Sequence, residues 1–195
     1  MDINRIPFYQ YNTIIVGTGA AGLNAAVTLH KLGQKNIALI TEGRYMGTSR
    51  NTGSDKQTYY KLTQCGSEPD SVRKMAETLF DGGCVDGDIA MAEAAGSLRA
   101  FYHLVDIGVP FPFNKSGEYV GYKTDHDPLK RGISAGPLTS KYMTECLERQ
   151  AEERGIPFFD GYQAVRLLTE EKNGEKWAAG IIALNKRKAA SADER

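Results

Sequence analysis

Cysteine and histidine are scarce in this sequence, and the few that are present do not cluster. The 195 residues include 3 cysteines and 3 histidines. None of them shows CxxC spacing or another spacing typical of a metal site, so we expect no metal site. The cysteines are odd in number and far apart, which favours reduced thiols and a cytoplasmic location over a disulfide framework.

Long apolar runs and an excess of charge of either sign are also lacking. No run of about 18 apolar residues occurs, so we expect no direct membrane insertion. The first ten residues have no apolar stretch of the kind found in secretory signals. Because 24 basic residues balance 24 acidic ones, the chain has no electrostatic signature of nucleic-acid binding. Its 41% of hydrophobic residues is typical of a globular domain.

The N-terminal part of the sequence predicts a βαβ unit over residues 12–42. A short β-branched run at 13–16 is typical of a buried parallel strand, and a second such run follows at 36–41. Between them, residues 20–32 predict a helix with Leu23, Ala26 and Val27 on its buried face. Gly33 follows at the position favoured for a helix C-terminus.

A glycine motif joins the first strand to this helix: Gly17, Thr18, Gly19, Ala20, Ala21 and Gly22 form GxGxxG. The first glycine permits a tight turn, the second lets a pyrophosphate approach the backbone, and the third lets the helix pack closely on the sheet. The helix N-terminus then offers N–H donors and a positive dipole end to the phosphates.

An acidic residue, Glu42, stands 20 positions after the last glycine, at the end of the second strand. This is the place where a dinucleotide-binding unit needs an acid to accept hydrogen bonds from the adenosine ribose. An acid here disfavours NADP, whose 2′-phosphate it would repel, although Arg44 close by weakens that argument. The competing interpretation is a glycine turn in an unrelated α/β protein.

The rest of the chain predicts a long loop, three helices and further strands. Residues 43–66 are polar and show no periodic pattern, and such loops in compact domains are usually functional or mobile. A helical segment is expected over 70–107, and a helix with a β-meander over 137–185. The expected strands lie at 156–159, 164–170 and 177–184, the last two joined by a Lys172-Asn173-Gly174 hairpin turn.

The helix expected at 88–107 has the clearest apolar pattern of the middle region. Asp88 is the expected N-cap, and Gly108 and Pro110 end the helix. Its expected buried face is formed by Met91, Ala95, Leu98, Tyr102 and Val105.

These features resemble one family of flavoproteins. The GTGAAGLNAA start, the acid after the second strand and the GTSRNTGS loop are similar to the flavoprotein subunits of succinate dehydrogenase and fumarate reductase, and to L-aspartate oxidase. The stretch at 134–183 is similar to the same family. The resemblance covers most of residues 11–185, with 63–130 matched less clearly. It implies an α/β fold: a Rossmann-like FAD-binding domain with a parallel sheet, helices and a three-stranded antiparallel β-meander.

The resemblance also implies which residues hold the cofactor. The glycine turn would contact the pyrophosphate of FAD, and Glu42 with Gly43 would lie at the ribose. Loop residues would line the flavin side, and the start of the meander would meet the adenine, with simple strand packing as the alternative there. The loop residues are Thr48, Ser49, Asn51, Thr52 and Gly53, and those at the meander are Ala164 and Val165.

The function implied is that of a flavin-dependent oxidoreductase. It would transfer hydride to or from a small, carboxylate-bearing substrate, and an electron-transfer partner subunit is possible. Respiratory members attach FAD covalently through a histidine, but the matching position here is Arg50. We therefore expect non-covalent FAD.

The family's substrate-binding and proton-transferring residues lie in parts beyond this sequence. We therefore expect an incomplete domain that is inactive by itself, and no catalytic residue is assigned. Two alternatives remain open. An NAD-dependent dehydrogenase is one, because Tyr119 and Lys123 have the Tyr-x-x-x-Lys spacing, although in loop-like sequence. A non-enzymatic scaffold with a nucleotide-binding fold is the other.

Overall fold

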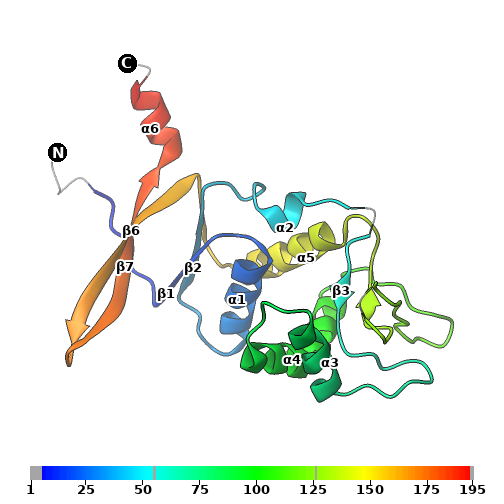
Figure 1. Cartoon of the computed structure of the whole chain (residues 1–195). Helices are drawn as coiled ribbons and strands as arrows, with labels where there is room; N and C mark the ends of the chain where they lie inside the picture. Colours follow the sequence, from blue (N-terminus) through cyan, green and yellow to red (C-terminus); the bar gives the residue numbers. More distant parts are fainter. Residues whose placement is uncertain (1–5, 55, 126, 194–195) are drawn as a thin grey trace. The chain divides into compact units, whose positions relative to one another are not determined.

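The structure is a computed structural model that describes residues 6–54, 56–125 and 127–193. The chain forms two compact units. The first runs up to Asn51 and resumes at Leu147, and the second extends from Thr52 to Cys146. Figure 1 labels most of the helices and strands of both units.

A parallel sheet forms the centre of the first unit. Its strand order is β1–β2–β5, with β1 at Thr13–Val16, β2 at Ile37–Thr41 and β5 at Phe158–Asp160. Every residue of the central strand β2 is buried, as its unbroken apolar sequence predicts. In the parallel register, Thr13 pairs with Ile37, and Leu39 pairs with Phe158.

Helix α1, at Ala20–Lys31, connects β1 to β2 and confirms the predicted βαβ unit. Its buried residues are Leu23, Ala26 and Val27, the predicted face. Leu32 is the C-cap of the helix, and Gly33 follows with a φ of +99°, a conformation that glycine adopts without strain.

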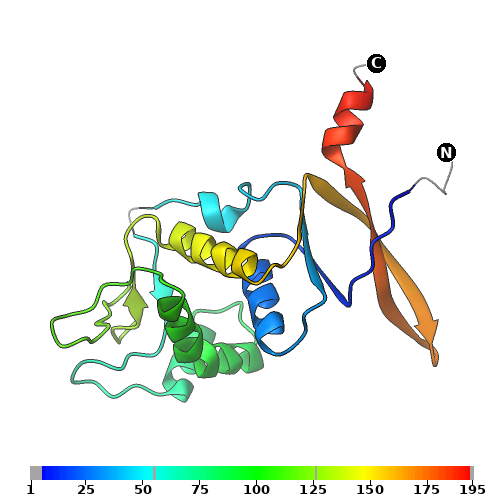
Figure 2. The ribbon, with the colours of Figure 1, turned by 180° about the vertical axis from the view of Figure 1, so that it is seen from behind.

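From Leu147 onward, the first unit contains the C-terminal part of a helix and a long ribbon. Helix α5, at Thr139–Glu153, buries Leu147 and Ala151 in this unit. Strands β6, at Tyr162–Lys172, and β7, at Glu175–Asn185, form an antiparallel ribbon that helix α6, at Lys186–Asp193, follows. Figure 2 shows the ribbon from behind, in orange, with α6 in red.

The parallel sheet and the antiparallel strands confirm the predicted α/β fold, but the three-stranded meander needs one correction. Strand β5 pairs in parallel with β2, so the antiparallel ribbon has two strands. The ribbon turns at Asn173 and Gly174, both with positive φ, as the hairpin motif predicts. Trp177 of β7 is 53% exposed.

The second unit combines a pair of packed helices with a short antiparallel strand pair and the N-terminal part of α5. Helices α3, at Val72–Asp81, and α4, at Gly87–Asp106, confirm the predicted helical segment. Strand β3, at Tyr59–Tyr60, pairs with β4, at Gly132–Ile133. Strand β3 lies within the stretch 43–66 that was expected to be irregular.

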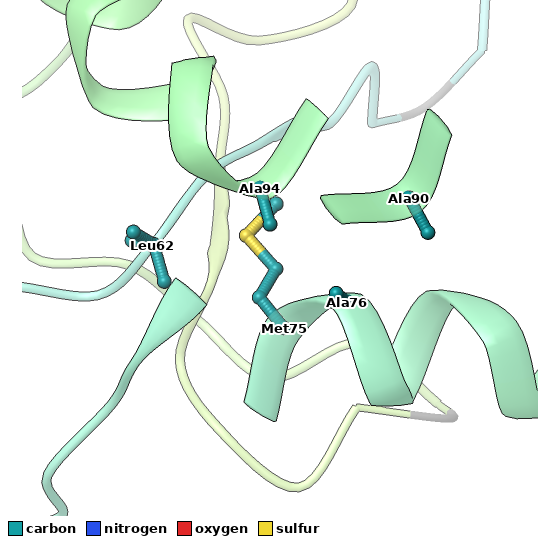
Figure 3. Packing of buried hydrophobic residues seen from close by; sticks show 5 residues of the cluster. All are labelled: Leu62, Met75, Ala76, Ala90 and Ala94. Atoms are coloured by element: carbon teal, nitrogen blue, oxygen red, sulfur yellow. The ribbon is translucent and has the colours of Figure 1, made fainter. Parts of the chain in front are cut away.

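Met75 of α3 occupies the centre of the second unit's core. It is fully buried, and Figure 3 shows its side chain reaching from α3 toward Ala94 of α4. The cluster around it is completed by Leu62, Ala76 and Ala90. The buried face of α4 is formed by Ala90, Ala94, Ser97, Phe101 and Leu104.

This face of α4 differs from the prediction by one position along the helix. Met91 and Tyr102, which were expected to be buried, are 44% and 40% exposed. The predicted N-cap is also shifted, because Asp86 and not Asp88 caps the helix. The Asp86 carboxylate accepts hydrogen bonds from the backbone N–H groups of Asp88 and Ile89.

Candidate cofactor-binding site

The glycine turn is the tightest part of the first unit. Gly17 has a φ of +101°, and its N–H donates to the carbonyl of Ile40 at 2.8 Å. A Cβ on Gly22 would lie 2.1 Å from the carbonyl oxygen of Gly17. Only glycine at position 22 therefore lets α1 begin this close to the end of β1.

The N-terminus of α1 faces the loop that follows β2. Gly19 is the N-cap and has no side chain with which to cap the helix. The Ala20 N–H instead donates to the Ser49 hydroxyl at 3.3 Å. Ser49 belongs to the short helix α2, at Thr48–Asn51, and a Cβ on Gly47 would be 3.7 Å from the Gly19 Cα. The loop thus packs directly on the glycine turn, where a helix dipole favours an anion.

The Thr18 side chain has a structural partner. Its hydroxyl donates to the Thr41 hydroxyl at 3.2 Å, and both residues are buried. The Thr41 hydroxyl in turn donates to the carbonyl of Gly43 at 3.3 Å. Thr18 therefore ties the glycine turn to the end of β2, beside Glu42.

Glu42 is exposed at the end of β2, and its carboxylate is paired with a lysine. The Lys186 ammonium, at the start of α6, donates to Glu42 Oε2 at 2.9 Å. The side chains are 45% and 47% exposed, so the pair is open to solvent. Sequence reasoning missed Lys186, because it lies 144 positions away and no local pattern marks it.

Arg44, the cation close to Glu42 in sequence, is bound by carboxylates of α5. Its Nε donates to Glu148 Oε1 at 2.9 Å, and its Nη2 also bonds Glu152. The guanidinium carbon lies 4.1 Å from the centroid of the Phe158 ring. Burial alone lowers the pKa of Arg44, but the hydrogen bonds that it donates to Glu152 and Glu148 raise the pKa above its ordinary value. Arg44 therefore serves the packing of the loop on α5 and β5.

Two further loop residues are bound within the first unit. Arg50 forms an ion pair with Glu148 and lies over the Tyr45 ring, 5.0 Å from its centroid. The Asn51 side-chain amide donates to the carbonyls of Tyr45 and Gly47 at 2.6 and 3.1 Å. Thr48 is exposed at the start of α2.

The remaining predicted site residues lie in two other segments. Thr52 and Gly53 are exposed and begin the second unit. In the first unit, Ala164 pairs with Ala183 on the ribbon, but the register then shifts before Arg166. Val165 is therefore the extra residue of a β-bulge, and its side chain is 54% exposed.

The pair that suggested an NAD-dependent dehydrogenase does not lie on a helix. Tyr119 and Lys123 are in irregular chain, and the Tyr119 ring packs edge-on against Phe101 with centroids 5.1 Å apart. A Tyr-x-x-x-Lys pair needs a helix to bring both side chains to one face. Among the described residues, no group of three or more His, Cys, Asp or Glu could hold a metal ion. None of the described helices is long and apolar enough to cross a membrane.

Curated proteins with related sequences include an oxidase and a reductase flavoprotein subunit. L-aspartate oxidase of Pseudomonas aeruginosa is 27% identical over 190 residues, which cover 91% of this chain and 34% of that protein. The 8-methylmenaquinol:fumarate reductase flavoprotein subunit of Wolinella succinogenes is 28% identical over 166 residues, or 84% of this chain and 27% of the relative. The chain thus spans about a third of the length of such relatives.

Solved structures show the same fold. Quinol fumarate reductase of E. coli superposes with a TM-score of 0.77 at 20% sequence identity, covering 92% of this chain and 30% of the other. The family model described as FAD binding domain matches residues 12–194. The chain therefore belongs to the FAD binding domain family, and its cofactor is FAD.

Proposed function

We propose that this chain is the FAD-binding portion of a flavin-dependent oxidoreductase that transfers hydride to or from a small, carboxylate-bearing substrate. The observation that carries the proposal is the glycine turn, with Glu42 at the end of the neighbouring strand. The named relatives, an aspartate oxidase and a fumarate reductase subunit, support this chemistry. The flavin supplies the redox chemistry when it is bound, and the protein supplies binding and orientation.

The first unit offers the kinds of chemical group that an adenine dinucleotide needs for binding. Gly19 leaves room at the N-terminus of α1, and the backbone from Gly17 to Gly22 would hold the pyrophosphate. Glu42 would accept hydrogen bonds from the ribose hydroxyls, with Gly43 beside it. The bulge at Val165 frees backbone groups next to Ala164 for an adenine.

The remaining loop residues are proposed to serve the flavin side of the cofactor. The Ser49 hydroxyl already bonds the first turn of α1, so it is placed to share that turn with a phosphate. Thr48, Asn51, Thr52 and Gly53 complete the proposed set.

Arg50 supports non-covalent binding of the flavin. It stands where respiratory relatives carry the histidine that attaches FAD, and a guanidinium held by Glu148 offers no such attachment point. Bound FAD is therefore expected to dissociate when the chain unfolds.

We also predict a small-molecule substrate, an electron-transfer partner subunit and a cytoplasmic location. A small-molecule substrate and an electron-transfer partner subunit follow from the relatives alone. The cytoplasmic location follows from the free cysteines and would be tested by cell fractionation.

Thermal unfolding with added nucleotides tests the proposal. A ligand present at about 100 times its Kd stabilises the folded state by about 2.7 kcal/mol. We expect a clear rise in melting temperature with FAD, a smaller rise with AMP, and none with NADP. A rise with NAD but not FAD would favour a dehydrogenase, and no rise with any nucleotide would favour the scaffold interpretation.

Gly19→Ala tests the proposed pyrophosphate contact by adding a single methyl group. The added Cβ would meet only the Ser49 hydroxyl, at 3.4 Å, which is an ordinary contact, and the φ of Gly19 is −75°. The variant should fold like the wild type but lose FAD binding, because the methyl group occupies the approach of the pyrophosphate. Gly96→Ala, in open space on α4, is the matched control and should bind FAD normally.

A further inference from the structure

We propose that Glu148 is a positioning residue of the cofactor site, whose single carboxylate clamps the loop after β2 onto the glycine turn. The identity of the ligand rests on the proposed function, but the clamp itself is a property of the chain. The clamp consists of Glu148 on α5 with Arg44 and Arg50, which stand at the two ends of the segment 44–50.

Each oxygen of the Glu148 carboxylate holds a different arginine. Oε1 accepts from Arg44 Nε at 2.9 Å and lies 2.7 Å from its Nη2, while Oε2 pairs with Arg50 Nη2. The side chains are 10% exposed for Glu148, 13% for Arg50 and 19% for Arg44. Water therefore screens these ion pairs much less than it screens a surface pair.

Both guanidinium groups are also fixed on their other side. Arg44 stacks on Phe158 of the parallel sheet, and Arg50 lies over Tyr45 of the loop itself. Glu152 adds a second carboxylate to Arg44, but its side chain is 51% exposed. Glu148 is thus the buried anion shared by both cations, and its loss would leave them close together without the charge between them.

The clamped segment carries the contacts that reach α1. Between the two arginines lie Gly47, which packs on Gly19, and Ser49, which accepts the Ala20 N–H. A carboxylate on the rigid helix α5 therefore determines where the Ser49 hydroxyl lies at the N-terminus of α1. A site prepared in this way loses less entropy when a ligand binds.

Hydrogen exchange measured by mass spectrometry tests the clamp without any ligand. In Glu148→Gln, amides of residues 44–51 should exchange about tenfold faster, and the FAD Kd should rise about tenfold, comparable with the effect of removing groups that orient metal ligands. Glu148→Asp should recover part of both. Glu153→Gln is the control, because Glu153 lies on the same helix with a 55% exposed side chain, and its partners, Arg149 at 3.9 Å and Gln150 at 2.7 Å, also lie on that helix.

Removal of a buried anion can itself impair folding, so Arg50→Met tests the clamp from its other end. It leaves Glu148 paired with Arg44 and should still raise exchange at residues 48–51. Unchanged exchange in Arg50→Met, or in a folded Glu148→Gln, overturns the clamp. Faster exchange with an unchanged FAD Kd overturns its role in the cofactor site. Wild-type protein that binds no FAD would overturn the proposed function instead, while the exchange data would still decide on the clamp.

Discussion

At the scale of single residues, Gly22 has the least room for a side chain. Its added Cβ would be 2.1 Å from a backbone oxygen of Gly17, and backbone cannot move aside as a flexible side chain can. We expect Gly22→Ala to destabilise the chain by about 1–3 kcal/mol, the usual cost of overpacking. The change should be measured as the free energy of unfolding in urea.

Gly96→Ala is the matched control for this substitution. Position 96 lies inside helix α4 and has no atom within 4 Å of an added Cβ. Alanine there should stabilise the helix by about 0.5–1 kcal/mol. Equal effects of the two substitutions would show that close packing at Gly22 is not what selects glycine.

Arg131 and Asp70 form a buried ion pair in the second unit. The Arg131 guanidinium donates to both oxygens of Asp70, at 2.9 and 2.7 Å, and the side chains are 0% and 1% exposed. Arg131 also donates to the hydroxyls of Tyr60 and Thr78. Loss of one partner of such a pair typically costs about 3–5 kcal/mol.

The Asp70 carboxyl should make stability fall in acid. Burial alone raises its pKa, but hydrogen bonds from Arg131 and from the backbone of Thr63 and Ser71 lower it below the ordinary value of 3.8. The ionised form therefore stabilises the fold above pH 3.8, and this contribution is lost as the pH falls through the lower pKa of the folded state. Asp70→Asn should lower the melting temperature at pH 7 and weaken its fall below pH 4. An equally steep acid limb in the variant would contradict this assignment.

At the scale of secondary-structure elements, the sequence correctly predicted the features that are determined by local interactions. The βαβ unit, the buried face of α1 and the Asn173-Gly174 turn all depend on residues close in sequence. The predicted buried face of α4 was wrong by one position. Bulky residues such as Met91 suggested burial, whereas Met75 of α3 requires the small Ala94 opposite it. Strand β5 joins the sheet through a partner more than a hundred residues away, which periodicity cannot reveal.

The N-cap of α4 is Asp86 and not the predicted Asp88, and substitutions at both positions test this assignment. Asp86 accepts hydrogen bonds from two backbone N–H groups, whereas Asp88 lies inside the first turn and acts only through the helix dipole. Asp86→Ala should cost about 1 kcal/mol of unfolding free energy, and Asp88→Ala less than about 0.5 kcal/mol. Urea unfolding followed by circular dichroism measures both, and the reverse order would restore Asp88 as the cap.

At the scale of the whole molecule, the site divides into a part that sequence predicts and a part that folding creates. The glycine motif and Glu42 lie within one βαβ unit, so their spacing reveals them. Lys186 pairs with Glu42 from 144 positions away, and Glu148 pairs with Arg50, in the loop after that unit, from 98 positions away. Both bind through charges that look like ordinary surface residues in the sequence. Contacts of this kind depend on the fold, and no local pattern marks them.

The division of the chain into two units predicts how destabilisation spreads through it. Each unit has a core of its own, with β2 buried against α1 in the first and Met75 between α3 and α4 in the second. Substitutions far from a cooperative unit usually leave its opening free energy nearly unchanged. Gly22→Ala should therefore speed hydrogen exchange in β2 much more than in α4, and Asp70→Asn should do the reverse. If either substitution accelerated exchange equally in both, the two cores would open together and the chain would be one cooperative unit.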